Sequence, residues 1–281
     1  MMTESQLKEK LLALVQADYQ ISESDDLDAL LQAMIVHIGA LDPELRDDLI
    51  YTTFFQLIHR QQVLTPQQLR RLLQQVLDDE HLFYGIGEQG TDSVFTRAFS
   101  VLLLPLLLIV HRRQAYLGVA EITEVWEKLL RFMREEQDRR GFVEGKGWAH
   151  AIAHAADALD DLAQCVEVGA DGLREILMAV QTAVCIQDTV YTHGEEERLV
   201  TPVIDLLRRG LLAEEEIVRW VEGFADTVTV VEGMPQRMYI QGNVANFLQS
   251  LYFRLTWAQL LGAEGEAITG TLRKLNRLAG D

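Results

Sequence analysis

Apolar residues recur along this chain with the period of an α-helix. In the opening stretch MMTESQLKEKLLALVQ, leucines return every three or four positions and polar residues fill the gaps. That spacing marks one apolar face on a helix. Alternation with a period of two is nearly absent. The only β-like stretch is Thr227–Val231, which we interpret as a loop or a helix end. The pattern predicts an all-α protein.

Capping residues, prolines and glycines predict where the helices begin and end. Ser24 is the expected cap of the second helix. Asp42-Pro43 and Thr65-Pro66 each pair an N-cap residue with proline at the first helical position. The expected helices span residues 3–17, 24–39, 43–60, 66–80, 92–112, 120–139, 147–163, 171–187, 195–209, 213–226, 239–260 and 263–279. The most apolar run, Val101–Val110, is shorter than the roughly 20 residues that cross a bilayer and contains a proline, so we expect a buried helix.

Helix pairs recur roughly every 45–55 residues, which is the range of HEAT-like repeats. Weak self-similarity supports this period, because Leu69–Leu73 resembles Leu173–Leu177 and Tyr84–Glu88 resembles Tyr191–Glu195. A single pair cannot bury its apolar face alone, so pairs are expected to stack. We therefore predict one domain over residues 1–281, a right-handed HEAT-like solenoid of about five helix pairs with end-capping helices. Its inter-repeat loops would share one edge.

The chain is strongly acidic, with a formal net charge of −18 and 48% hydrophobic residues. Nucleic-acid binding depends on clustered Lys and Arg, and an anionic membrane would repel this charge, so neither partner is expected. The acidity favours solubility, with steering of a cationic ligand as the alternative. Cys165 and Cys185 lack metal or disulfide spacing. They fit packed residues in a reducing, cytoplasmic protein without a signal peptide.

The candidate site centres on the helix expected from Gly147. His150, His154 and Asp157 would lie on successive turns, opposite the apolar face that includes Trp148. Two imidazoles and one carboxylate can bind a divalent metal such as Zn²⁺, or act in general acid/base catalysis. The alternative is an ordinary structural contact, since HxxxH without the glutamate of HExxH is a weak motif.

The preceding loop supplies further candidates for ligand binding. Arg139, Arg140 and Lys146 are expected to receive a carboxylate or phosphate, together with the N-terminus of the following helix. Glu144 lies in the same loop. The alternative is a solvated helix end followed by a flexible loop.

A second region, Tyr191–Arg198, is expected beside this loop in the next repeat. There His193, Glu197 and Arg198 would face the polar stripe of the first region. The helix macrodipole alone also explains acids at this helix start. Lesser candidates for the binding site are Tyr84, Glu88, Trp126 and Arg237. Of these, Trp126 fits a core position better.

The stretch RGFVEGKGWAHAIAHAADAL resembles the bacterial domain of unknown function 2785 family, and Glu195–Leu199 resembles a second block of that family. The resemblance implies a helical, HEAT-like fold over about residues 40–260. It implies no catalytic residue. P-loop, dinucleotide-fold and GxSxG motifs are absent from the sequence.

Repeat proteins commonly present extended surfaces to partners. We therefore expect a binding or scaffold module for a peptide, a protein or a small polar ligand along the loop edge. The alternative is a metal-assisted or acid/base enzyme centred on His150, His154 and Asp157.

Overall fold

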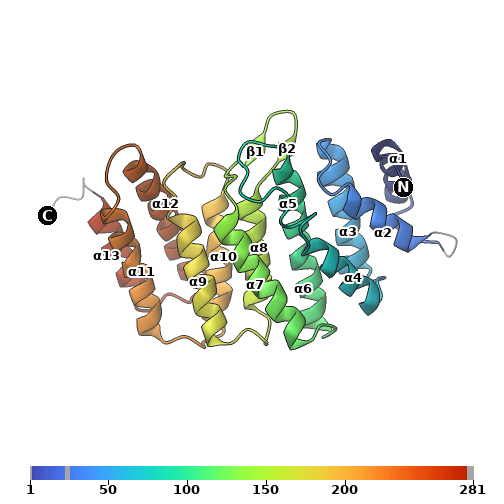
Figure 1. The fold of residues 1–281 in the computed structure, drawn as a ribbon. Helices are drawn as coiled ribbons and strands as arrows, with labels where there is room; N and C mark the ends of the chain where they lie inside the picture. Colours follow the sequence, from blue (N-terminus) through green and yellow to red (C-terminus); the bar gives the residue numbers. More distant parts are fainter. Residues whose placement is uncertain (1, 23–25, 277–281) are drawn as a thin grey trace. The chain divides into compact units, whose positions relative to one another are not determined.

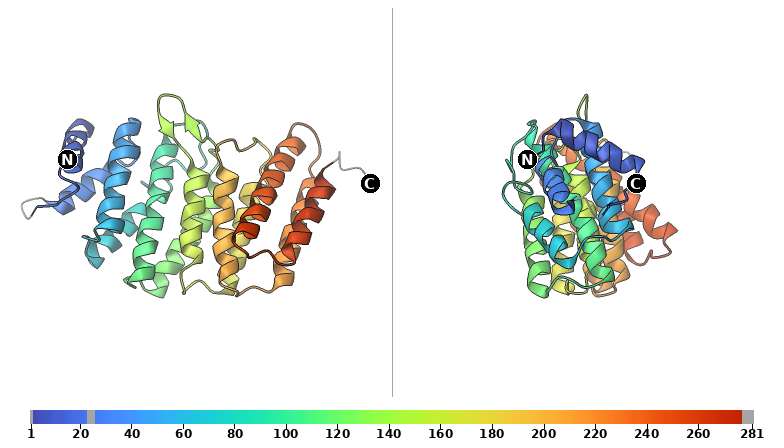
Figure 2. Two further views of the ribbon diagram at one scale, coloured as in Figure 1. Left: turned by 180° about the vertical axis from the view of Figure 1, so that it is seen from behind. Right: turned by 90° about the vertical axis from the view of Figure 1, so that its right-hand side faces the viewer.

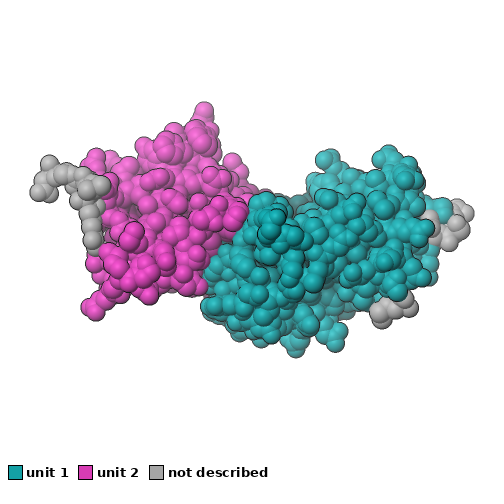
Figure 3. Space-filling view, turned by 90° about the horizontal axis from the view of Figure 1, so that it is seen from above, with its two compact units in different colours: residues 1–158 teal, residues 159–281 magenta. Residues whose placement is uncertain are grey.

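The computed structural model describes residues 2–22 and 26–276, and its regular structure is almost entirely helical (Figure 1). The all-α prediction is confirmed. By its internal contacts the chain divides into two compact units, residues 1–158 and 159–281, and the division falls within helix α8 (Figure 3). Each unit is described by itself below.

Unit 1 consists of short helices and one β-hairpin. Its elements are α1 (Glu4–Gln16), α2 (Leu27–Val36), η1 (Glu44–Tyr51), α3 (Thr52–Phe54), η2 (Phe55–Arg60), α4 (Pro66–Val76), α5 (Ser93–Val101), α6 (Leu103–Arg113), α7 (Val119–Glu135), β1 (Phe142–Val143), β2 (Gly147–Trp148) and the first part of α8 (Ala151–Ala163). The segments η1 and η2 are π-helical. Thr65 caps α4 as expected and forms a capping box with Gln68. Asp26 caps α2, whereas Ser24 lies outside the described residues.

Helices α5 and α6 form the apolar centre of unit 1. Pro105 has no N–H to donate one turn back, and the helix is interrupted at Leu102 just before it. Residues 101–108 are buried, which confirms the expected buried helix. Among the described residues, the combined helix Ser93–Arg113 is the one that is long and apolar enough to cross a membrane. Of its most apolar window 78% is buried inside the protein, as in a core helix.

The hairpin β1–β2 differs from the sequence-based prediction of a loop that leads into a helix at Gly147. Phe142 pairs with Trp148 and Val143 with Gly147 in antiparallel register. Ala149 and His150 continue this pairing by donating to the carbonyls of Gly141 and Arg140, at 2.8 and 3.0 Å. The backbone from Gly147 to His150 is therefore used for strand-like pairing, and α8 begins only at Ala151.

Helix α8 also differs from the amphipathic surface helix that was predicted. Its alanines and its leucines are almost completely buried, and so are His154 and Asp161. The alanine-rich sequence AIAHAADAL suits this position, because small side chains let neighbouring elements approach the helix closely. The polar stripe is therefore not a solvated face.

Unit 2 is built from the rest of α8 and five further helices among the described residues. These are α9 (Ala170–Val184), α10 (Glu195–Arg208), α11 (Glu214–Thr229), α12 (Gln236–Trp257) and α13 (Glu264–Leu275). Helix α10 packs against α12, and α11 packs against α13 (Figures 1 and 2). Thr227–Thr229 completes α11, which confirms a helix end there. Cys165 is buried and Cys185 half-buried, and neither forms a disulfide bond.

The turn after α2 lies close to α5 at Gly39, where a Cβ would lie 2.9 Å from the Cα of Thr96. We predict that Gly39→Ala lowers the free energy of unfolding by about 1–3 kcal/mol, because backbone would have to move to admit the methyl group. Urea denaturation measures this change. The matched control is Gly169→Ala, since an added Cβ there meets no atom within 4 Å. An equal effect of the two substitutions would contradict the close contact.

Candidate functional site

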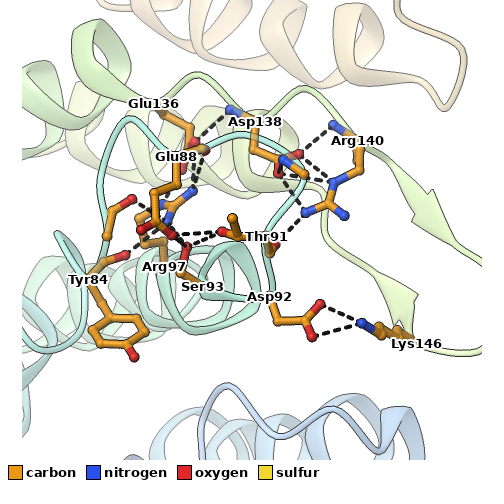
Figure 4. Close-up of polar contacts among 12 residues, drawn as sticks. Tyr84, Glu88, Thr91, Asp92, Ser93, Arg97, Glu136, Asp138, Arg140 and Lys146 are labelled. Carbon is orange, nitrogen blue, oxygen red and sulfur yellow. Dashed lines mark hydrogen bonds and ion pairs between the residues drawn. The ribbon is translucent and has the colours of Figure 1, made fainter.

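The loop between α4 and α5 is held by a buried ion pair. Arg97 on α5 is fully buried, and its Nε and Nη2 donate to the carboxylate of Glu136 at 2.6 and 3.0 Å. Its Nη1 donates to the carbonyls of Tyr84 and Gly85 and to the hydroxyl of Ser93, each at 2.7–2.9 Å (Figure 4). One guanidinium thus connects the loop, α5 and the segment after α7.

A second set of contacts neutralises two of the predicted anion-binding cations. Arg140 makes a bidentate ion pair with the buried carboxylate of Asp138, which also accepts from the amide of Gly90 (Figure 4). Lys146 Nζ lies 2.6 and 2.8 Å from the two carboxylate oxygens of Asp92. Both cations therefore join the hairpin region to the loop before α5.

Arg46 of η1 anchors the hairpin through a hydrogen bond to its backbone. Its guanidinium is fully buried and donates to the carbonyls of Lys146 at 2.6 Å and Ala40 at 2.7 Å. Its Cζ also lies 4.4 Å from the centre of the Phe95 ring. Gly147 is required at this contact. Its φ is +78°, and a Cβ there would lie 2.8 Å from Pro43 and 3.0 Å from Arg46.

Asp47 lies beside this anchor and accepts a hydrogen bond from the backbone N–H of Trp148. Its Oδ1 is 2.8 Å from Arg46 Nε. Burial raises the pKa of the Asp47 carboxyl from 3.8 to about 6, although the neighbouring Arg46 and the Trp148 hydrogen bond act in the opposite direction. The Asp47 carboxyl, which accepts this hydrogen bond from the hairpin, is therefore expected to change its charge near pH 6.

Aromatic rings extend from the hairpin surface into the core. Phe142 and Trp148 meet edge to face with centroids 5.2 Å apart, and they are 47% and 40% exposed. Trp148 stacks on His150 at 4.4 Å, and His150 meets His154 at 5.9 Å. His154 in turn contacts the ring of Phe99 at 5.3 Å. The hairpin thus presents two aromatic side chains on a well-packed base.

The three residues of the predicted metal site have different environments. His150 precedes α8 with a left-handed φ of +52° and is half-buried. His154 is buried, with its Nδ1 3.0 Å from the carbonyl of Ala98. Asp157 is half-buried on α8. Within residues 2–22 and 26–276, no group of three His, Cys, Asp or Glu side chains is arranged to hold a metal ion. The metal site stays a prediction.

Arg139 is the cation of the predicted loop for which two donors have no acceptor in the described part of the chain. Its Nε and Nη1 are shielded from solvent and have no hydrogen-bond partner among the described residues. Arg140 and Lys146, by contrast, are both paired. Sequence reasoning placed Arg139 in the anion-binding loop but could not separate it from these two neighbours, because pairing depends on Asp138 and Asp92.

The remaining predicted residues lie at the tip of the hairpin and in unit 2. Glu144 is exposed between β1 and β2. His193 and Glu197 are exposed near the start of α10, and Arg198 is half-buried. Buried Glu195, which was not predicted, accepts from the amide of His193 at 2.9 Å and closes this turn. The proximity expected between this region and the hairpin stays a prediction.

We predict that Glu136→Ala lowers the free energy of unfolding by about 3–5 kcal/mol, because it leaves the Arg97 guanidinium buried without its counter-charge. Replacing both partners, as in Arg97→Met with Glu136→Leu, should recover only part of the loss, because the carbonyls of Tyr84 and Gly85 and the amide of Asp138 lose their partners as well. The surface control is Glu135→Ala, which breaks an exposed pair with Arg131 and should cost less than about 1 kcal/mol. Urea unfolding of the four proteins measures these differences. A Glu136→Ala loss no larger than the control would refute the role of the pair.

We also predict a pH dependence from Asp47. Its folded pKa of about 6 lies above the usual 3.8, so the folded state holds the proton more tightly than the unfolded state. The stabilising effect of that proton is complete below pH 4 and is lost as the pH rises through 6. The free energy of unfolding of the natural protein, relative to Asp47→Asn, should fall by up to about 3 kcal/mol between these limits. The exposed neighbour Asp48→Asn is the control. A flat difference for Asp47→Asn would contradict the raised pKa.

Comparison with known proteins gives one match. The family model described as protein of unknown function (DUF2785) matches residues 82–253, which is more than half of the chain. No curated protein and no solved structure matches the chain. The matched segment includes the loop before α5, the hairpin and all of α8 to α11. The resemblance noted in the sequence is thereby confirmed, and this chain belongs to the DUF2785 family of proteins of unknown function.

Proposed function

We propose that this protein is a binding module for a small ligand that carries a carboxylate or phosphate group together with a planar or apolar portion. Arg139 would bind the anionic group, and the exposed rings of Phe142 and Trp148 would contact the rest. The observation that carries the proposal is the half-buried side chain of Arg139, whose Nε and Nη1 are shielded from solvent and lack a hydrogen-bond partner among the described residues.

The energetic argument rests on the cost of that arrangement. A solvent-shielded donor without an acceptor costs about 1–3 kcal/mol, and more when it belongs to a charged group. In unit 1 the neighbouring cations of the same loop are paired at 2.6–2.8 Å, and the buried Arg46 and Arg97 have multiple acceptors. An anionic ligand would supply what Arg139 lacks. Arginine suits this role, because its planar donors match the oxygens of carboxylates and phosphates.

The hairpin supports recognition of the second part of the ligand. The backbone bond from His150 to the carbonyl of Arg140 places Arg139 at the base of the hairpin, next in sequence to its first paired residue. Phe142 and Trp148 are held by Arg46 and by the His150 stack, so they lose little conformational freedom on binding. Exposed, rigid aromatic side chains are common anchors of binding sites.

We further propose that the helices form a HEAT-like array that carries this site. Packing between second neighbours supports it, since α2 contacts α4, α4 contacts α6, α10 contacts α12 and α11 contacts α13. Such packing is expected when successive helix pairs stack. The alternative of a metal-assisted or acid/base enzyme at His150, His154 and Asp157 has no specific observation in its favour among the described residues.

Calorimetric titration with phenyl phosphate, phenylacetate and inorganic phosphate tests the proposal. We expect phenyl phosphate to bind the natural protein, and Arg139→Met to weaken it at least roughly tenfold, equivalent to about 1.4 kcal/mol. Arg139→Met should also raise stability without ligand, because it removes two solvent-shielded donors that lack acceptors. Trp148→Ala should weaken phenyl phosphate but leave inorganic phosphate unchanged.

The matched control is Arg71→Met, which removes a half-exposed arginine of α4 that pairs with Asp28. It should bind phenyl phosphate as the natural protein does. The proposal is wrong if none of the three anions binds, or if Arg139→Met binds them with unchanged affinity.

A further inference from the structure

A cavity of about 460 Å³ lies in unit 2 between the first turn of α10 and one face of α12. Its volume is in the range of sites for small organic ligands. The residues that line it are Glu196, Glu197, Asn246, Gln249, Ser250, Phe253, Arg254 and Trp257. The cavity uses none of the residues proposed above to bind an anion.

One wall of the cavity is aromatic. Phe253 and Trp257 lie one turn apart on α12, with stacked rings whose centroids are 6.1 Å apart. They are 52% and 74% exposed, which is a large exposure for such side chains. The faces of aromatic rings attract cations, and indole does so most strongly.

The opposite wall is acidic, and one of its carboxylate oxygens lacks a hydrogen-bond partner among the described residues. Glu195 closes the turn before α10, so capping does not require Glu196. The Oε2 atom of Glu196 is shielded from solvent and has no hydrogen-bond partner among the described residues. Burial raises the pKa of the Glu196 carboxyl; a hydrogen bond from its own backbone N–H acts in the opposite direction, and the charges of Glu195 and Glu197 add to the effect of burial. This acid is therefore held at an energetic cost that a bound cation would offset.

The one cation in the lining is already engaged. Arg254 Nη1 donates to the carbonyl of Glu197 at 2.7 Å and to the hydroxyl of Thr201 at 3.0 Å. Two carboxylates against one guanidinium leave the lining with a net negative charge. The overall charge of −18 also favours the approach of a cation.

We propose that this cavity binds a small organic amine in its protonated form. The ammonium group would donate to Glu196 and Glu197, and its carbon skeleton would lie against Phe253 and Trp257. An uncharged apolar ligand would not satisfy the Glu196 carboxylate, and an anion would be repelled by it. The hydroxyl oxygen of Ser250 and the side-chain carbonyl oxygens of Asn246 and Gln249 can accept further hydrogen bonds from the N–H groups of the amine.

The cavity proposal makes a distinctive thermodynamic prediction. An ammonium group favours the ionised form of the Glu196 carboxyl, so binding of the amine will release a proton at any pH at which this carboxyl is still protonated in the free protein. The measured binding enthalpy will then depend on the ionisation enthalpy of the buffer. A merely apolar contact produces no such dependence.

Calorimetric titration with phenethylamine and its neutral analogue 2-phenylethanol tests the proposal. We expect the amine to bind the natural protein at least roughly tenfold more tightly than the alcohol. Glu196→Gln should remove that preference and the buffer dependence, and Trp257→Ala should weaken the amine severalfold. The control Glu215→Gln removes an exposed acid from the first turn of α11, away from the cavity, and should change neither.

Equal affinities for amine and alcohol would show an apolar site only and overturn the proposal. So would the absence of amine binding at millimolar concentration, or unchanged binding by Glu196→Gln. Arg139→Met provides the separating control, because it should abolish anion binding and leave amine binding intact. The two proposals can therefore fail independently.

Discussion

A guanidinium removed from water must be satisfied by the protein, and in unit 1 this requirement organises the surface loops. Arg97 and Arg46 are both fully buried. Arg97 donates hydrogen bonds to carbonyls of the loop before α5 and to the carboxylate of Glu136, whereas Arg46 donates to the carbonyls of Ala40 and Lys146. Breaking any of these contacts would leave donors without partners in a region of low dielectric constant. The loops are therefore fixed although they contain little regular secondary structure.

The same requirement explains why Arg139 differs from its neighbours. The hairpin, the preceding loop and η1 satisfy the other cations of the region with carboxylates or carbonyls. Arg139 has two solvent-shielded donors, Nε and Nη1, that lack an acceptor in the described part of the chain, whereas Arg46 at the hairpin anchor lacks one at Nε alone. In the proposed site, the ligand would supply the acceptor that the protein does not provide for these donors.

The sequence predicted the helices well and the site only in part. Thr65-Pro66 and the apolar run Val101–Val110 gave a correct cap and a correct buried helix, because capping and helical periodicity are local. The start of α8 was misplaced, since Gly147–Trp148 has no strand signature by itself. Its pairing with Phe142–Val143 depends on a turn through Gly145 and on the hydrogen bond that Arg46 donates to the carbonyl of Lys146.

The candidate site was also predicted only in part, because local sequence patterns do not show contacts between distant segments. Periodicity placed His150 and His154 on one helix face, but His150 precedes the helix and His154 is turned to the carbonyl of Ala98. Arg140 pairs with Asp138, which lies two residues away in the sequence, whereas the pairing of Lys146 with Asp92 depends on tertiary structure. The cavity in unit 2 combines α10 with α12, about 50 residues apart, and gave no sequence signal beyond Glu197.

Amide hydrogen exchange of the natural protein tests most directly whether buried arginines fix this surface. If Arg46 and Arg97 hold the hairpin and loop as described, the amides of Lys146, Ala149 and His150 will exchange almost as slowly as those of the core helix α6. Exchange of these three amides at the rate of an unstructured peptide, with α6 still protected, would contradict a preorganised site.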